Sequence, residues 1–169
     1  MDLHSARLVF SPFTESDFSK YLKLVTDPRV MEMITGRALS ELEAMDRFIG
    51  NLLCNMEHPD IGWYSVHTND DRTFIGLAKI VMTAKHEAEI GYSLLTEHWG
   101  KGYGSEISET MVLHAKTIRS IHSLIAIIDP ANKVSKRILE KGNFLLDKVC
   151  ELNGLPGEIY RLNFKFLTA

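Results

Sequence analysis

A glycine-rich segment that joins a strand pattern to a helical pattern restricts the fold more than any other feature of the sequence. The segment WGKGYGSE covers 99–106 and has glycine at three alternate positions. Residues 86–95 before it alternate as a strand does, and residues 103–119 after it carry apolar side chains at helical spacing. Residues 122–129 form an apolar run typical of a strand covered on both faces. This order predicts a βαβ unit in the middle of the chain.

The remaining patterns place helices before this unit and strands on both sides of it. Thr14 with Asp17, and Ser40 with Glu43, have the spacing of capping boxes, and Asp27 precedes a proline at a helix start. The patterns predict strands at 6–13, 63–68, 73–82, 144–150 and 158–167, and helices at 14–26, after 27, at 40–56 and at 132–142. The last two strands are expected to flank the turn NGLPG. We expect one α/β (α+β) domain over 1–169, with a mixed sheet of about seven strands flanked by helices.

Composition and charge restrict the class of protein. The 169 residues are 45% hydrophobic and 24% charged, which suffices for a sizeable core. A net charge of −3 without a basic stripe disfavours nucleic acid as the main partner. No secretory signal and no run of membrane-spanning length is found, so we expect a cytoplasmic protein with no membrane partner. The seven histidines and two cysteines fit no ligand spacing, so we expect no metal.

The glycine loop is typical of an anion site, because the first N–H groups of a helix lack partners and carry the positive end of its dipole. Lys101 adds a positive charge. The P-loop pattern GxxxxGK[ST] is absent. The dinucleotide fingerprint GxGxxG is matched at Gly100 and Gly102, and Asp129 ends the next strand, but Ser105 replaces the third glycine. A dinucleotide-binding oxidoreductase is therefore the less favoured alternative.

A third class of phosphate-bearing ligand, coenzyme A, is indicated by the longer segment AEIGYSLLTEHWGKGYGSE. This segment resembles the acyl-CoA-binding motif [QR]-x-x-G-x-[GA] of the GNAT superfamily of N-acetyltransferases. Trp99 takes the Q/R position, and Gly102 and Gly104 are the small residues. WGKGYG after AEIGY is similar to the branch of bacterial ribosomal-protein alanine and serine N-terminal acetyltransferases. ARLVFSPFTESD and DPANKVSKRILEKGNF resemble further segments of that branch, in the same order.

The resemblance implies the GNAT acyl-CoA N-acyltransferase fold, with the sheet splayed between its fourth and fifth predicted strands, 86–95 and 122–129. Acetyl-CoA would bind in this opening as a cosubstrate. Backbone groups of Ser93 and Leu94 would pair with its pantetheine arm. Asn132 would bond the same arm, and Ser135 would lie near the thiol sulfur. The pyrophosphate would be held by the backbone N–H groups of Gly100, Lys101, Gly102, Tyr103, Gly104 and Ser105.

The implied reaction is direct attack of a neutral primary amine on the acetyl thioester in a ternary complex. An ammonium must first lose a proton, and Glu89, the glutamate of AEIGY, is the expected base. The same residue equally fits a solvated strand position or a salt-bridge partner for Lys79 or Lys85. The backbone N–H of Leu94 would stabilise the oxyanion. A tyrosine that many members use to protonate the thiolate is replaced by Leu139, so Ser135 or water would supply that proton.

The acceptor amine is not specified by the sequence. In this fold, residues near 28–40 and 151–160 would surround it, and Met31, Met33, Ile34 and Trp63 are candidates for an apolar wall, although most also fit the core. The acceptor is expected to be a protein N-terminal amine or a small-molecule amine, and a homodimer is one expectation from the family. A catalytically weak or inactive acyl-CoA-binding module is the alternative, because the tyrosine is missing.

Overall fold

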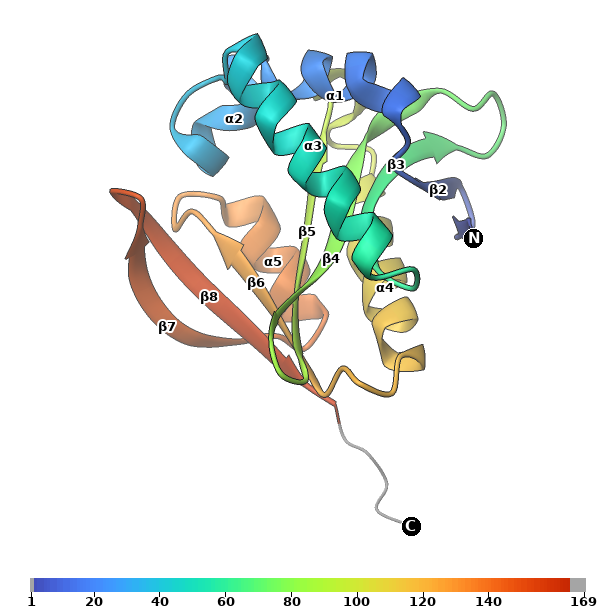
Figure 1. Ribbon diagram of the computed structural model, residues 1–169. Coiled ribbons are helices and arrows are strands. Elements are labelled where there is room, and N and C mark those ends of the chain that lie inside the picture. Colours follow the sequence, from blue (N-terminus) through green and yellow to red (C-terminus); the bar gives the residue numbers. More distant parts are fainter. Residues whose placement is uncertain (1, 165–169) are drawn as a thin grey trace.

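The computed structural model describes residues 2–164, which form one mixed sheet of eight strands between two layers of helices (Figure 1). Every neighbouring pair of strands is antiparallel except β5 with β6, which is parallel. Across the sheet the strands are β1 (Leu3–His4), β2 (Leu8–Pro12), β3 (Gly62–Thr68), β4 (Phe74–Ala84), β5 (Glu87–Leu94), β6 (Ser123–Ile128), β8 (Leu155–Asn163) and β7 (Leu145–Leu152).

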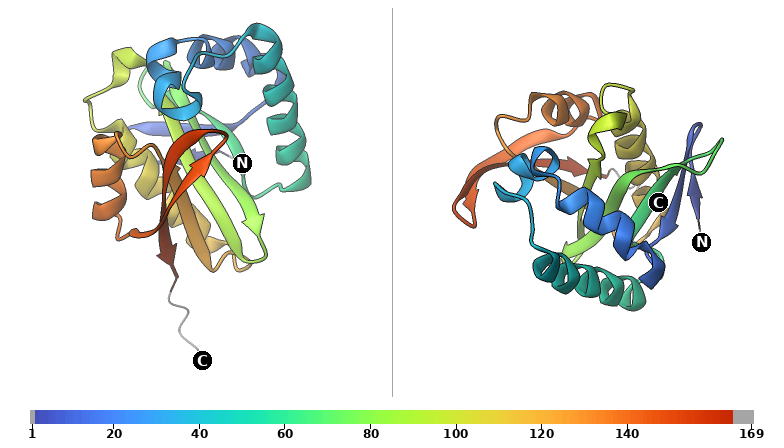
Figure 2. Two further views of the ribbon diagram at one scale, coloured as in Figure 1. Left: turned by 90° about the vertical axis from the view of Figure 1, so that its left-hand side faces the viewer. Right: turned by 90° about the horizontal axis from the view of Figure 1, so that it is seen from above.

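Five helices cover the two faces of the sheet, three on one face and two on the other (Figure 2, right). Helices α1 (Phe18–Val25), α2 (Pro28–Thr35) and α3 (Glu41–Glu57) cover one face. Helices α4 (Tyr103–Thr117) and α5 (Lys133–Lys141) cover the other. Short 3-10 turns at Glu15–Asp17 and Thr96–His98 precede α1 and the glycine loop.

The helix starts lie where the local sequence predicts them. Ser40 and Glu43 form the reciprocal bonds of a capping box, and so do Thr14 and Asp17. The Asp27 side chain accepts a backbone hydrogen bond from the first turn of α2. These caps satisfy N–H groups that have no partner inside the helix, and they depend only on neighbours in the chain.

One short strand was not predicted, and the predicted start of the last strand was wrong. The first strand, predicted at 6–13, is preceded by the two-residue β1, which is too short to produce a periodic signal and brings the count to eight. The turn between the last strands is only Asn153 and Gly154, both with positive φ, as in the common two-residue hairpin, so β8 begins at Leu155. The predicted end of that strand at 165–167 lies outside the described residues.

The buried apolar residues form two clusters, one on each face of the sheet. Ile90, Tyr92 and Leu94 of β5 pack in the cluster shared with α4, as their alternation predicts. The other cluster lies under α1, α2 and α3. Because side chains alternate along a strand, Glu89 and Gly91 face this second layer.

The sheet opens between β5 and β6, as the sequence predicted for its fourth and fifth strands. The two strands pair at only three positions, which end with Glu89 opposite Ile125. Beyond this pair β5 continues to Leu94 beside β4, and β6 continues to Ile128 beside β8. We call the opening beyond the Glu89–Ile125 pair the fork.

Candidate functional site

The register of β5 on β4 determines which backbone groups face the fork. The N–H of Leu95 donates to the Ile75 carbonyl at 2.9 Å, and inward and outward groups alternate along an antiparallel pair. Tyr92 and Leu94 therefore direct their N–H and C=O groups toward the fork, whereas those of Ser93 point toward β4. A Cβ built on Gly76 of β4 would lie 2.1 Å from the Ser93 carbonyl oxygen, so this carbonyl is directed at β4 and not at the fork. The expectation that backbone groups of Ser93 pair with a pantetheine arm does not hold in this register.

Trp99 folds the loop back onto the end of β5. Its indole N–H donates to the Leu94 carbonyl at 2.9 Å, while its side chain stays half exposed. One of the two outward groups of Leu94 is therefore occupied within the protein, and its N–H is the group left for a ligand. The contact gives Trp99 a structural role at the Q/R position of the motif.

The glycine loop presents a row of free donors at the start of α4. Among the described residues, no acceptor meets the backbone N–H groups of positions 100–105. Gly100 and Gly102 have φ of 72° and 80°, in the left-handed region that favours glycine. A Cβ on Gly100 would meet nothing within 4 Å, so open space lies beside this loop. Free N–H groups, a helix N-terminus and open space together fit a pyrophosphate.

Gly104 is required for a different reason, which is contact with Tyr92. A Cβ at Gly104 would lie 2.8 Å from the Tyr92 hydroxyl. That hydroxyl also hydrogen-bonds to the side chain of Ser135 on α5. Burial raises the pKa of Tyr92, and the Ser135 hydrogen bond opposes that rise. Tyr92 thus connects β5, α4 and α5 at the fork, a role that its strand pattern did not reveal.

Asn132 and Ser135 lie together at the start of α5. The Asn132 side-chain oxygen caps the helix by accepting from the Ser135 backbone N–H at 3.0 Å. Asn132 therefore fixes the position of Ser135, and its amide N–H₂ group is left for other contacts. Leu139, at the position of the family tyrosine, is 4% exposed and belongs to the core. Helix α5 ends at Lys141, with Gly142 as its C-cap, and the left-handed residue is Asn143, one position later.

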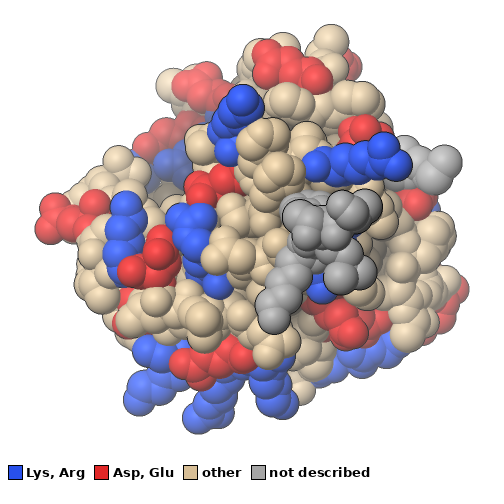
Figure 3. All heavy atoms as spheres, turned by 90° about the horizontal axis from the view of Figure 1, so that it is seen from below, with Lys and Arg blue, Asp and Glu red and all other residues tan. Residues whose placement is uncertain are grey.

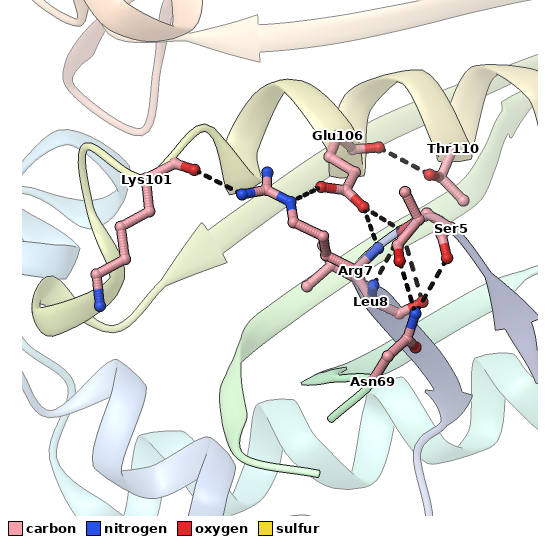
Figure 4. A network of polar contacts seen from close by, with 8 residues as sticks. Ser5, Arg7, Leu8, Asn69, Lys101, Glu106 and Thr110 are labelled. Atoms are coloured by element: carbon pink, nitrogen blue, oxygen red, sulfur yellow. Dashed lines mark hydrogen bonds and ion pairs between the residues drawn. The ribbon is translucent and has the colours of Figure 1, made fainter. Parts of the chain in front are cut away.

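Arg7 ties the glycine loop and the first turn of α4 to β2 (Figure 4). Its guanidinium donates to the Lys101 carbonyl at 3.1 Å and to the Glu106 carboxylate at 2.7 Å. It also lies 4.6 Å above the ring of Tyr103. The side chain of Lys101 extends away from this network (Figure 4). No local pattern in the sequence indicates this connection, because its partners are about a hundred positions apart.

Glu106 carries the other half of that connection. Burial acts to raise its pKa, but bonds from the Ser5 hydroxyl and from the Arg7 N–H and guanidinium hold the pKa below its usual range. Its carboxylate is therefore committed to the scaffold. The exposed Ser105 lies one position before it, with its backbone N–H still free.

Glu89 lies at the base of the fork, on the last paired position of β5. Its carboxylate forms an ion pair with Lys79 of β4, with 2.6 Å between Oε1 and Nζ. Both side chains are about four-fifths shielded from solvent, at 18% and 20% exposed. Glu89 thus forms the expected salt bridge with Lys79. It does so at the base of the fork, where a carboxylate could also accept a proton from an amine.

The residues expected to line the acceptor side differ in exposure. All three methionine and isoleucine candidates lie on α2, where Met31 is buried and Met33 and Ile34 are 42% and 48% exposed. The loop after α2 reaches the β7–β8 hairpin, since a Cβ on Gly36 would lie 3.2 Å from the Leu155 side chain. These two segments, predicted to surround the acceptor, therefore meet.

The rest of the described surface carries charged side chains (Figure 3) and two hollows. They contain no group of three or more His, Cys, Asp or Glu side chains able to hold a metal ion. Within 2–164, no helix is both long and apolar enough to cross a membrane. On the face in Figure 3, acidic and basic side chains are interspersed. One hollow is lined by Asp60 and the C-terminal end of α4, and another by residues 2–6 and α4.

Comparison with known proteins agrees with this geometry. Residues 7–144 match the family described as "Acetyltransferase (GNAT) domain". An uncharacterized N-acetyltransferase of Bacillus subtilis, YoaA, is 24% identical over 164 residues, covering 91% of this chain and 90% of its own length. A GNAT-family acetyltransferase from Bacillus anthracis superposes with a TM-score of 0.82 at 19% identity, over 96% of this chain and 98% of that one.

A second solved structure matches the branch suggested by the sequence. The ribosomal L7/L12 alpha-N-protein acetyltransferase RimL, in complex with coenzyme A, superposes with a TM-score of 0.82 at 18% identity. The match covers 96% of this chain and 98% of that chain. The dinucleotide-binding alternative does not fit, because the described sheet has one parallel pair of strands and six antiparallel pairs.

Proposed function

Because the chain belongs to the acetyltransferase (GNAT) family, we propose that it transfers the acetyl group of acetyl-CoA to a primary amine. The observation that carries this proposal is the fork, with the free N–H groups of 100–105 at its mouth. These groups suit the pyrophosphate, and the outward N–H groups of Tyr92 and Leu94 suit the pantetheine arm as an added strand would. Asn132 would contribute its free amide N–H₂ group.

The proposed chemistry is direct attack within a ternary complex. Glu89 takes a proton from the acceptor ammonium, directly or through water, and the neutral amine attacks the thioester carbon. The Leu94 N–H stabilises the oxyanion that forms. As the C–S bond breaks, the nitrogen of the tetrahedral adduct gives up its second proton to water, and the thiolate takes a proton from Ser135, whose hydroxyl is hydrogen-bonded to Tyr92 and is reprotonated by water. No metal takes part in this scheme.

The acceptor class is the finer part of the proposal. The L7/L12 alpha-N-protein acetyltransferase is named for a protein N-terminal amine, so we rank N-terminal amines first and small-molecule amines second. The cytoplasmic location, the absence of membrane and nucleic-acid partners, and a homodimer stay predictions from the sequence. So does the assignment of all of 1–169 to a single domain.

An acceptor panel tests the function. Thiol release from acetyl-CoA would be followed with N-terminal peptides beginning with alanine or serine, the same peptides with a blocked amine, and a set of small primary amines. We expect release that depends on a free amine and a mass increase of one acetyl group on the acceptor. Tight coenzyme A binding without turnover on any amine would instead favour the inactive acyl-CoA-binding module.

The role of Glu89 has its own test, the variant Glu89→Gln. Removing a general base lowers kcat by about 10²–10⁴-fold, with coenzyme A affinity unchanged. The expected loss is largest at neutral pH and becomes smaller as free amine increases at alkaline pH. Unchanged turnover between pH 6 and 9 would remove Glu89 from the mechanism.

A further inference from the structure

Lys79 is a second charged residue at the fork, and the proposed mechanism does not use it. It lies in the middle of β4, directly opposite Trp63 on β3 and Gly91 on β5. Its Nζ is 2.6 Å from Glu89 Oε1 and 5.3 Å from the centre of the Trp63 ring. Three strands therefore contribute to its surroundings, and its ammonium contacts the carboxylate at the base of the fork.

The neighbouring strand β5 leaves space for the Lys79 side chain at Gly91. A Cβ on Gly91 would lie 3.0 Å from Lys79 Cε and 3.5 Å from Cγ. The stem of Lys79 thus crosses over Gly91, and a larger side chain there would push the ammonium away from Glu89. The φ of Gly91 is not in the left-handed region, so the glycine serves side-chain space and not backbone conformation.

The pairing has a physical reason beyond packing. A largely shielded charge is costly without a partner, and removing one member of such a pair leaves the other uncompensated. Lys79 therefore pairs with the charge of the Glu89 carboxylate and restricts where that carboxylate can lie. An ionised carboxylate is the form that a base requires before it takes a proton.

Other charged or titratable groups near this pair are already engaged or lie on its far side. Arg161 is bound by Glu87 and by Asp147, so those three form a separate network. On α3, burial raises the pKa of the Cys54 thiol, Glu57 raises it further and Lys79 lowers it. The Cys54 thiol of α3, with Glu57 near it, is thus within electrostatic reach of Lys79.

We propose that Lys79 is a positioning residue that holds the Glu89 carboxylate at the base of the fork, where it can accept the proton of the acceptor amine. The proposal rests on the proposed function, because it assigns a partner to the base of that reaction. In this proposal Trp63 and Gly91 help to position Lys79. Trp63 lies beside its ammonium group, and Gly91 leaves space for its aliphatic stem.

Three variants test the proposal by their pH profiles. Lys79→Met keeps the stem and removes the charge, Lys79→Arg keeps the charge, and Lys85→Met removes an exposed lysine of the same hairpin that has no ion pair among the described residues. In Lys79→Met the pH at which kcat/KM falls on the acid side is expected to rise by about one unit. Activity would then be about tenfold lower in acid and return to the wild-type value in alkali, whereas Lys79→Arg and Lys85→Met keep the wild-type profile.

A loss of the same factor at every pH in Lys79→Met would overturn the proposal, because it would indicate a structural role only. So would a profile identical to that of the wild type. A second measurement does not need turnover. Carboxyl-carbon NMR of the ligand-free protein, with the Glu89 signal assigned by Glu89→Gln, should show titration at higher pH in Lys79→Met than in Lys85→Met.

The two measurements separate the two failures. If no amine is acetylated but the NMR titration moves as expected, the proposed function fails and the pairing stands. If the wild type is active but neither the profile nor the titration moves, the role of Lys79 fails alone.

Discussion

At the scale of single residues, the three glycines of the loop have two different physical roles. Gly100 and Gly102 allow a left-handed backbone beside open space. Gly104 makes room for the Tyr92 hydroxyl, which bonds to Ser135. The loop motif therefore encodes both the shape of an anion site and the position of a side chain at the fork.

This difference predicts that Tyr92→Phe partly rescues an alanine at position 104. Gly104→Ala should destabilise the fold by about 1–3 kcal/mol, because an added methyl group in a packed site forces its neighbours apart. Tyr92→Phe in the same chain should recover part of that loss, since the closest atom is then removed, while two ring carbons at 3.0 and 3.1 Å stay. Urea unfolding of the two single variants and the double variant measures the coupling.

Gly100→Ala is the matched control for that pair. It should cost about 1 kcal/mol through its left-handed backbone, with no recovery on combination with Tyr92→Phe. Strict additivity of Gly104→Ala with Tyr92→Phe would contradict the contact.

At the scale of elements, α4 is held to the sheet through Arg7 and Glu106 as well as through its apolar face. Ile107 and Met111 bury that face, and the Glu106 carboxylate joins the first turn to β2. This turn presents the free N–H groups, so its position on the sheet sets where a pyrophosphate would lie.

Glu106→Gln tests this attachment through the pH dependence of stability. The folded-state pKa of Glu106 is depressed, so its contribution is present above the unfolded pKa and is lost as pH falls through the folded value. At pH 7 the variant should be less stable by about 1–3 kcal/mol, and the difference from the wild type should shrink below about pH 4. Urea unfolding at both pH values measures it.

Glu109→Gln is the control, since Glu109 is exposed on the same helix and should change stability little at either pH. A deficit in Glu106→Gln that persists unchanged in acid would show that the carboxylate charge is not the cause.

At the scale of the whole molecule, the fork divides the sheet into two halves that share three paired positions and the helix α4. Figure 2 shows the hairpin of β7 and β8 diverging from β4 and β5. The backbone groups of β5 that face this opening lack a strand partner, which gives a long ligand an edge to pair with.

Residue-resolved hydrogen exchange tests this edge. Adding coenzyme A should slow exchange of the Tyr92 and Leu94 amides and of the amides of 100–105. The amide of Ser93, already directed at β4, should change little and serves as the internal control. Protection of Ser93 with none at Leu94 would contradict the register described here.

Much of this protein follows from its sequence alone. Helix caps, the alternation of β5, the glycine loop and the family are determined by neighbours in the chain, because hydrogen bonds and side-chain direction repeat over two to four positions. For the same reason the motif suffices to place Asn132 and Ser135 at a helix start.

Tertiary structure alone decided the contacts between distant segments. The backbone of Ser93 faces away from the fork because of the register on β4, which a one-residue shift would reverse. Arg7 meets Glu106, Tyr92 meets Ser135, and Lys79, rather than Lys85, pairs with Glu89. Such contacts depend on how strands and helices pack, since local patterns fix which residues share a face and not which partner lies opposite.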